Sequence, residues 1–110
     1  MKPVVYIDDE PMLCRAIRMV FASAEIPVET FSDPTEALRF LAEHEVAVVI
    51  CDYRMPGLSG LDVLEKLPHP VPYYLVTGEL EIAAPEGVIE VLEKPFPLQR
   101  LVEIARKYLD

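Results

Sequence analysis

Basic side chains are scarce in this chain of 110 residues, which has 10 lysines and arginines against 19 aspartates and glutamates. The net charge of −9 argues against direct nucleic-acid binding, which needs a basic surface. The chain also lacks an apolar run long enough to cross a membrane, and no signal-peptide pattern opens it. These absences predict a cytoplasmic protein that contacts neither nucleic acid nor membrane directly.

Cysteine occurs only twice, and internal repeats and low-complexity tracts do not occur. Cys14 and Cys51 each lie within an apolar pattern, so we expect two buried thiols rather than a disulfide. Apolar residues make up 52% of the chain, which is enough for a hydrophobic core at this length. We therefore expect one domain over residues 1–110.

Strand-like and helix-like patterns alternate along the chain. Short apolar runs predict strands over residues 3–7, 27–31, 46–51, 72–76 and 88–92. Apolar residues at helical spacing predict helices over 11–24, 34–41, 59–67 and 98–109. This alternation is typical of an α/β domain with a doubly wound sheet of five parallel strands and helices on both faces. The segment 78–87 is the exception, because it is short, holds Pro85 and shows little helical periodicity.

Chemically active side chains follow four of the predicted strands. The carboxyl ends of parallel strands meet at one edge of a sheet, where α/β proteins place their sites. The residues at these ends are Asp8, Asp9 and Glu10, then Asp52, then Thr77 and Gly78, and finally Lys94 and Pro95. We therefore expect carboxylates, a hydroxyl and an amine to face one crevice.

Each of these residues also has an ordinary structural explanation. Acids at positions 8–10 stabilise the start of a helix, and Asp52 suits a turn. Thr77 is a common strand residue, and a lysine such as Lys94 usually lies on the surface. One cap explains one acid, however, whereas several acids facing Asp52 repel one another unless a cation is present. Oxygen ligands without a Cys/His cluster favour Mg²⁺ over zinc.

Asp52 is the candidate nucleophile of such a site. A carboxylate can attack a phosphoryl donor to give an acyl phosphate. Phosphoryl transfer depends mainly on positioning and on positive charge around the transferred oxygens, which Mg²⁺ and Lys94 would supply. Acids rather than a glycine-rich loop follow the first strand, and this argues against a nucleotide or flavin site.

Four short motifs occur in order along the chain. They are Ile7-Asp8-Asp9-Glu10, Asp52-x-x-Met55-Pro56-x-x-x-Gly60, Val76-Thr77-Gly78 and Glu93-Lys94-Pro95-Phe96. Each motif is weak alone, but together, over residues 3–109, they give a chain that resembles the receiver domain of two-component response regulators. The resemblance implies a flavodoxin-like sheet with strand order 2-1-3-4-5.

The resemblance also implies a phosphoacceptor and a metal site. Asp52 would accept the phosphoryl group from the phosphohistidine of a sensor histidine kinase or phosphotransfer protein. Asp9 and Asp52 would bind Mg²⁺ together with the main-chain carbonyl of Arg54. Asp8 would act through a water molecule on the ion.

Further roles follow from the same resemblance. Lys94 would pair with the phosphoryl oxygens, and Thr77 would move toward them as the switch. The peptide bond between Lys94 and Pro95 would be cis. Arg54 and Glu79 match positions that tune dephosphorylation, and their opposite charges suggest an ion pair across the crevice.

Two features depart from the usual receiver pattern. Val91 stands three residues before Lys94, where receivers usually have an aromatic ring that reports the state of the threonine. Lys94 follows Thr77 by only 17 positions, fewer than is typical, and the deficit falls within 78–87. We therefore expect the fourth helix to be shortened or missing, and with it the conventional readout surface.

Three functions are compatible with these residues. The first is a phosphorylatable receiver that controls a downstream protein and promotes only its own phosphorylation and dephosphorylation. Within 110 residues it would be either a stand-alone receiver or one module of a longer polypeptide. The second is a scaffold with the receiver fold and no phosphorylation-driven switch. The third, a phosphatase with an aspartyl nucleophile, is disfavoured because Arg54 stands where such enzymes place a second Asp as general acid.

Overall fold

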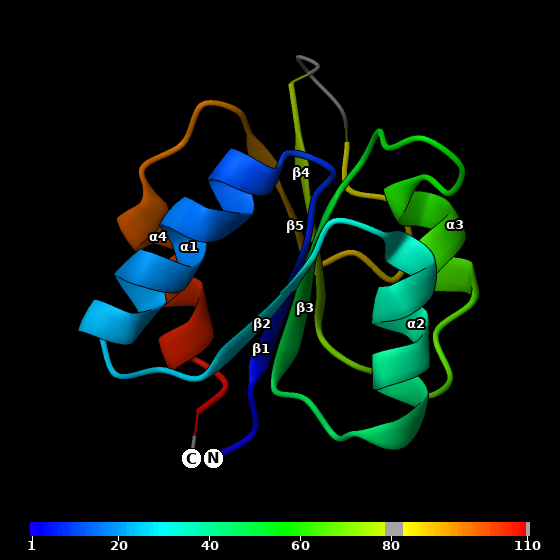
Figure 1. Cartoon of the computed structure of the whole chain (residues 1–110). Helices are drawn as coiled ribbons and strands as arrows, with labels where there is room; N and C mark the ends of the chain where they lie inside the picture. Colours follow the sequence, from blue (N-terminus) through cyan, green and yellow to red (C-terminus); the bar gives the residue numbers. More distant parts are fainter. Residues whose placement is uncertain (79–82, 110) are drawn as a thin grey trace.

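The computed structural model describes residues 1–78 and 83–109 and has three layers, with a parallel sheet between two pairs of helices (Figure 1). The five strands lie, in spatial order, at β2 (Val28–Phe31), β1 (Val4–Ile7), β3 (Val48–Asp52), β4 (Tyr73–Thr77) and β5 (Glu90–Glu93). Every pair of neighbouring strands is parallel. The doubly wound sheet and the strand order 2-1-3-4-5 are therefore confirmed.

Helices cover both faces of this sheet. α1 (Pro11–Ser23) and α4 (Leu98–Arg106) lie on one face, and α2 (Pro34–Glu43) and α3 (Gly60–Glu65) lie on the other (Figure 1). Between β4 and β5, the described residues 78 and 83–89 form no helix, in agreement with the shortened segment. No helix in the described ranges is long and apolar enough to cross a membrane.

The sheet separates two hydrophobic cores because side chains alternate along each strand. On the side of α1 and α4, Tyr6 and Ile50 belong to the same buried cluster as Ile17. On the opposite side, Val49 belongs to a second cluster with Leu41 of α2. A strand that is buried on both faces consists of continuous apolar residues, and this is why the runs in the sequence predicted β1, β3 and β4 correctly.

Cys14 and Cys51 are buried free thiols, as expected. Cys14 lies in the cluster beneath α1, whereas Cys51 lies in the cluster on the other side of the sheet. The sheet therefore stands between the two sulfur atoms.

Short-range signals in the sequence explain where the helices begin. α2 begins at Pro34 because the side chain of Asp33 accepts a hydrogen bond from the main-chain N–H of Thr35 (2.9 Å). α3 begins after Ser59, which exchanges side-chain and main-chain hydrogen bonds with Asp62 in a capping box.

At two boundaries the predicted element extends beyond the observed one, because apolar side chains outside the element also pack in the core. The fifth strand starts at Glu90 rather than at position 88, because Val88 is buried in a turn in which its N–H donates to the Pro85 carbonyl (3.0 Å). The last helix ends at Arg106, although Leu109 still packs against the core. In α3, Val63 is fully buried, and Leu61 and Leu64 pack partly buried against the same cluster.

Candidate functional site

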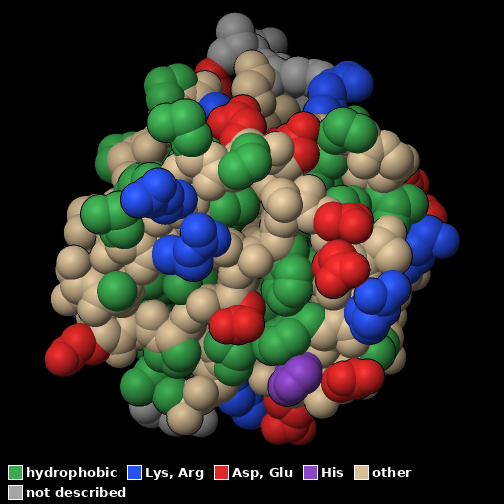
Figure 2. Space-filling view, viewed as in Figure 1, with side chains coloured by type: hydrophobic (Ala, Val, Ile, Leu, Met, Phe, Trp, Pro, Cys, Tyr) green, Lys and Arg blue, Asp and Glu red, His purple; other side chains and the backbone are tan. Residues whose placement is uncertain are grey.

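The strand register places the acids at the carboxyl ends of β1 and β3 side by side. Ile7 pairs with Cys51 in the parallel ladder, so Asp8 and Asp52 are the next residues on their strands. Both acids are on the same side of the sheet as Tyr6 and Ile50, because side chains alternate. Carboxylate oxygens of Asp8, Asp9 and Asp52 all lie within 4.8 Å of one another. Figure 2 shows acidic side chains at the upper edge of the molecule, where the strands end.

Asp8 is fully buried and is held by three hydrogen-bond donors. Its Oδ2 accepts from the Tyr6 hydroxyl (2.8 Å) and from Lys94 Nζ (2.9 Å). Its Oδ1 accepts from the main-chain N–H of Glu10 (3.1 Å). The carboxylate is therefore fixed in orientation at the centre of the acidic cluster.

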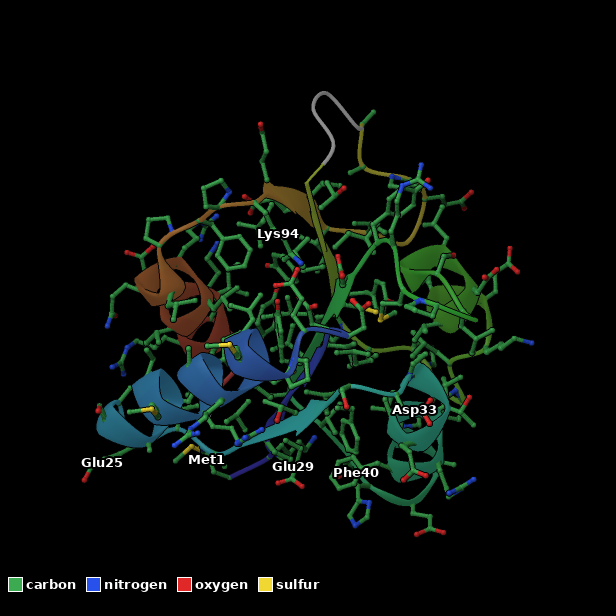
Figure 3. All side chains as sticks on the ribbon, turned by 45° about the horizontal axis from the view of Figure 1, so that its top comes forward. Met1, Glu25, Glu29, Asp33, Phe40 and Lys94 are labelled. Carbon is green, nitrogen blue, oxygen red and sulfur yellow. The ribbon has the colours of Figure 1, made fainter. Side chains whose placement is uncertain are left out.

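Lys94 brings the positive charge to this cluster from the far edge of the sheet. Glu93, the last residue of β5, pairs with Thr77, and the main-chain N–H of Lys94 donates to the Thr77 carbonyl (2.7 Å). The ammonium lies 2.9 Å from Asp8, 3.4 Å from Asp52 and 3.8 Å from Glu10. The Lys94–Pro95 bond is cis, as the resemblance implies. Figure 3 turns this edge of the sheet forward and labels Lys94.

The electrostatics of the cluster follow from burial and from like charges. Burial, together with the negative charge of Asp8, raises the pKa of Asp52 to about 7, although Lys94 opposes this rise. Burial disfavours the Lys94 ammonium, but its hydrogen bond to Asp8 and the charge of Asp8 more than compensate, so the pKa of Lys94 is raised. Without additional positive charge, the site therefore favours protonation of one of its carboxylates.

A tight loop after β3 positions Asp52. The N–H of Tyr53 donates to the Val76 carbonyl (2.8 Å), and the N–H of Gly60 donates to the Tyr53 carbonyl (2.8 Å). A Cβ atom on Gly60 would stand 2.6 Å from the Asp52 carbonyl oxygen and 2.6 Å from a methyl group of Leu75. The glycine of the Met55-Pro56-x-x-x-Gly60 motif is therefore required by close packing of α3 against the end of β3.

Other expected site residues lie around this cluster. Thr77 is the last residue of β4 and is buried. The Arg54 guanidinium lies over the Tyr53 ring, 5.4 Å from its centroid, on the exposed side of the loop. Glu79, the expected partner of Arg54, lies outside the described residues. Val91 is partly buried against the core on the side of α2 and α3.

Tyr6 is a residue at this site that the sequence analysis missed. It stands two residues before Asp8, and this spacing puts both side chains on one face of the strand. Burial and the neighbouring Asp8 charge raise the pKa of Tyr6, so its hydroxyl stays protonated and donates a hydrogen bond to Asp8. The sequence does contain a signal for this residue: side chains alternate along a strand, so a tyrosine two residues before Asp8 faces the same side of the sheet as that acid.

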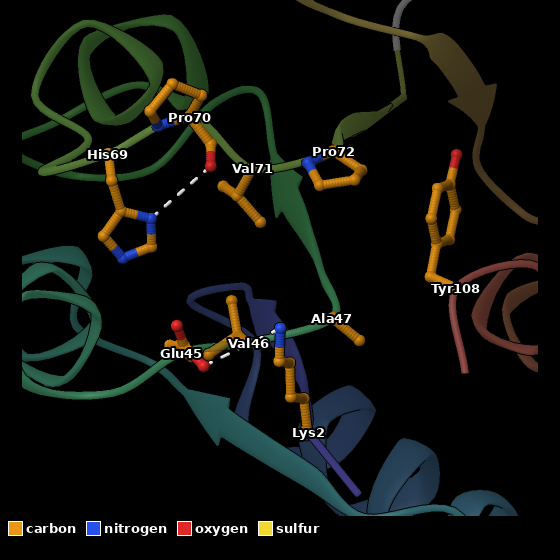
Figure 4. A pocket seen from close by; sticks show the side chains of 9 residues that line it. All are labelled: Lys2, Glu45, Val46, Ala47, His69, Pro70, Val71, Pro72 and Tyr108. Carbon is orange, nitrogen blue, oxygen red and sulfur yellow. Dashed lines mark hydrogen bonds and ion pairs between the residues drawn. The ribbon is translucent and has the colours of Figure 1, made fainter. Parts of the chain in front are cut away.

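A separate hollow of about 310 Å³ lies at the amino end of the sheet (Figure 4). Its rim includes Lys2 and Glu45, an exposed ion pair with 3.7 Å between charged atoms, and His69. None of the acids at the carboxyl ends of the strands lines it. The hollow offers neither a nucleophile nor a cluster of ligands, and the acidic cluster lies at the opposite end of the sheet.

The chemistry of the acidic cluster suits a hard divalent cation. Three carboxylates within 4.8 Å of one another supply oxygen ligands alone, which Mg²⁺ prefers and zinc does not. The raised pKa of Asp52 indicates that the cluster lacks positive charge, and a divalent cation would supply it. The residues present therefore fit a magnesium ion.

Comparison with known proteins identifies the family of this site. The model of the response regulator receiver domain matches residues 4–106. The chain belongs to this family. Receiver domains of response regulators act in two-component signal transduction, and the relatives of this receiver domain are regulators rather than enzymes of metabolism.

Two relatives illustrate the similarity. The receiver domain is 37% identical, over 94% of its length, to the C4-dicarboxylate transport transcriptional regulatory protein DctD of Rhizobium meliloti, of which it covers 24%. It is 30% identical, over 89% of its length, to the transcriptional regulatory protein FixJ of Bradyrhizobium diazoefficiens, of which it covers 52%. The chain thus spans about a quarter of the DctD protein and half of FixJ.

Solved structures show the same fold. A response regulator receiver domain protein from Clostridium thermocellum superposes with a TM-score of 0.85 at 30% identity, covering 98% of this chain and 94% of the other. The response regulator TrrA from Thermotoga maritima, solved in complex with Mg²⁺–BeF, superposes with a TM-score of 0.84 at 25% identity. That match covers 99% of this chain and 100% of TrrA.

Proposed function

We propose that this receiver domain, over residues 1–110, accepts a phosphoryl group on Asp52. The observation that supports this most directly is the gathering of Asp8, Asp9 and Asp52 within 4.8 Å, with Lys94 Nζ 3.4 Å from Asp52. Packing acids together costs stability, and a structural role alone gives no compensation for that cost. A scaffold without phosphorylation would gain nothing from this arrangement, so it is not the function we propose.

In this proposal the donor is the phosphohistidine of a sensor histidine kinase or of a phosphotransfer protein in the cytoplasm. A carboxylate oxygen of Asp52 attacks the phosphorus, the P–N bond breaks, and the imidazole leaves with the bonding electrons. The ammonium of Lys94 turns from Asp8 toward the oxygens of the transferred group, and the hydroxyl of Thr77 approaches the same oxygens.

Asp9, Asp52 and the main-chain carbonyl of Arg54 would hold Mg²⁺, with Asp8 acting through a water molecule, and the bound ion would supply positive charge to the transferred oxygens. The phosphoryl group adds roughly 1.5–2 negative charges at neutral pH. These charges would attract Lys94 and Thr77 toward Asp52, and this movement would pass the signal to a downstream protein. Val91 has no aromatic ring that could change position together with Thr77. We therefore expect the signal to reach the partner through the segment that follows Thr77.

Labelling with a small phosphodonor tests this function. Acetyl phosphate with Mg²⁺ should add one phosphoryl group to the intact protein, detected by mass spectrometry, and chelation of Mg²⁺ should prevent this. Asp52→Asn should abolish the label, whereas Asp33→Asn, at a helix cap remote from the cluster, should keep it. If the wild type remains unlabelled by acetyl phosphate and by a phosphorylated histidine kinase, or if Asp52→Asn is labelled as fully as the wild type, the proposal is wrong.

A further inference from the structure

Three tyrosines with fully buried rings, Tyr6, Tyr73 and Tyr74, use their hydroxyl groups in different ways. Tyr73 donates to the main-chain carbonyl of Gly60 (2.6 Å), and Tyr74 shares a hydrogen bond with the hydroxyl of Tyr108 (2.7 Å). Tyr6 donates to a side-chain oxygen of the acidic cluster, Asp8 Oδ2, at 2.8 Å. The four receiver motifs do not include Tyr6.

Tyr6 and Lys94 donate to the same oxygen atom. Asp8 Oδ2 accepts both the Tyr6 hydroxyl and the Lys94 ammonium, while Oδ1 accepts the N–H of Glu10. The tyrosine ring and the main chain are fixed by the core, whereas Lys94 is a long side chain that also lies 3.4 Å from Asp52. Of the three donors, Lys94 is therefore the one that can leave.

We propose that Tyr6 is a positioning residue that keeps Asp8 oriented toward the metal ion while Lys94 moves to the phosphoryl group. This inference rests on the proposed function, in which Lys94 must exchange Asp8 for the transferred oxygens. After that exchange, Tyr6 and the Glu10 N–H still hold both carboxylate oxygens of Asp8. Without the hydroxyl, Lys94 is the one donor to Oδ2 among the residues that the structure describes, so Lys94 is bound more firmly and Asp8 turns when Lys94 leaves.

Removal of one hydroxyl tests this role with a matched control. Tyr6→Phe and Tyr74→Phe each delete one buried hydroxyl beneath the same pair of helices, and Tyr74 bonds far from the acids, to Tyr108. The measurements are the Mg²⁺ dissociation constant, from an NMR titration of the amides of residues 8–10, and the rate of labelling by acetyl phosphate at saturating Mg²⁺.

Loss of a residue that orients a metal ligand typically weakens metal affinity or activity about 10- to 100-fold. We expect Tyr6→Phe to weaken Mg²⁺ binding by about 10-fold and to slow labelling even at saturating Mg²⁺. Tyr74→Phe should leave both quantities unchanged. If Tyr6→Phe lowers only the unfolding temperature and keeps the wild-type dissociation constant and labelling rate, the hydroxyl merely stabilises the fold and the inference is overturned.

A second measurement on the wild type applies if Tyr6→Phe fails to fold. With ¹³C at the tyrosine Cζ atoms, the Tyr6 signal should shift when Mg²⁺ or beryllofluoride is added, and the Tyr74 signal should not. A Tyr6 signal that ignores saturating Mg²⁺ overturns the inference. If the wild type binds Mg²⁺ and is labelled, and Tyr6→Phe does both equally well, only the role of Tyr6 is refuted. A wild type that does neither refutes the proposed function as well.

Discussion

Neutralising Asp52 should stabilise the metal-free protein. Asp52→Asn keeps the size and shape of the side chain and removes one negative charge from a cluster in which Asp8 and Asp9 remain. Burial and the charge of Asp8 disfavour the ionised form of Asp52 more than Lys94 favours it, and so its pKa is raised to about 7. The variant removes this unfavourable ionisation altogether.

The size of the effect follows from the pKa of Asp52 in the two states. The rise from the ordinary value of 3.8 to about 7 is equivalent to about 4 kcal/mol at a pH above both values. Asp8 and Lys94 can rearrange in the variant, so we expect a measured gain of about 1–3 kcal/mol. Between pH about 4 and about 7 the native wild type holds one proton more than the unfolded chain, so its stability falls as the pH rises through this window.

Urea unfolding followed by far-ultraviolet circular dichroism measures the gain. With a chelator at about pH 8, Asp52→Asn should unfold at a higher urea concentration than the wild type, and near pH 4.5 most of the difference should vanish. Saturating Mg²⁺ should stabilise the wild type more than the variant, because a ligand stabilises the state that binds it. Glu29→Gln, which neutralises an exposed acid on β2, should stay within about 0.5 kcal/mol of the wild type.

The reasoning fails if Asp52→Asn is no more stable than the wild type in the chelator at about pH 8. It also fails if the gain is the same near pH 4.5 as near pH 8, since an effect of ionisation must follow the protonation of Asp52. An equal gain in Glu29→Gln would point to the net charge of the molecule instead of the acidic cluster.

Two further substitutions test the cluster and its support. Lys94→Met should lower the free energy of unfolding of the metal-free protein by about 2–4 kcal/mol at neutral pH, because it leaves buried acids without their partner. The control Lys2→Met, which breaks the exposed pair with Glu45, should cost less than about 1 kcal/mol. Equal losses for the two variants in urea unfolding would contradict this prediction. Gly60→Ala should cost about 1–3 kcal/mol, because its Cβ would stand 2.6 Å from the Asp52 carbonyl; an unchanged midpoint would show that α3 can shift freely.

The geometry of the acidic cluster could be predicted from the sequence because parallel strands end at a common edge. Once 3–7, 46–51 and 88–92 are recognised as strands, Asp8, Asp52 and Lys94 have to meet near that edge. The alternation of side chains supports the same prediction. Asp8, Asp52 and Lys94 each stand an even number of residues from a side chain in the core beneath α1 and α4, so they face the same side of the sheet. Positions along the strand were thus enough to bring the three residues together.

Element boundaries were harder to predict because apolar side chains report burial and not backbone conformation. Val88 and Leu109 pack against the core from a turn and from the chain beyond α4, so the pattern extended β5 and α4 too far. Tyr6 was missed for a related reason. An aromatic side chain within a buried strand suggests packing alone, and the sequence does not show where its hydroxyl finds a partner.

The central strand β3 has its side chains in both cores, Ile50 beneath α1 and α4 and Val49 beneath α2 and α3. A displacement of its carboxyl end is therefore shared by the two helical layers and cannot stay within one of them. By thermodynamic reciprocity, a protein that binds either helical layer more tightly after this displacement also favours the displacement. A partner bound to the helices would then favour phosphorylation of this receiver without contacting the aspartates.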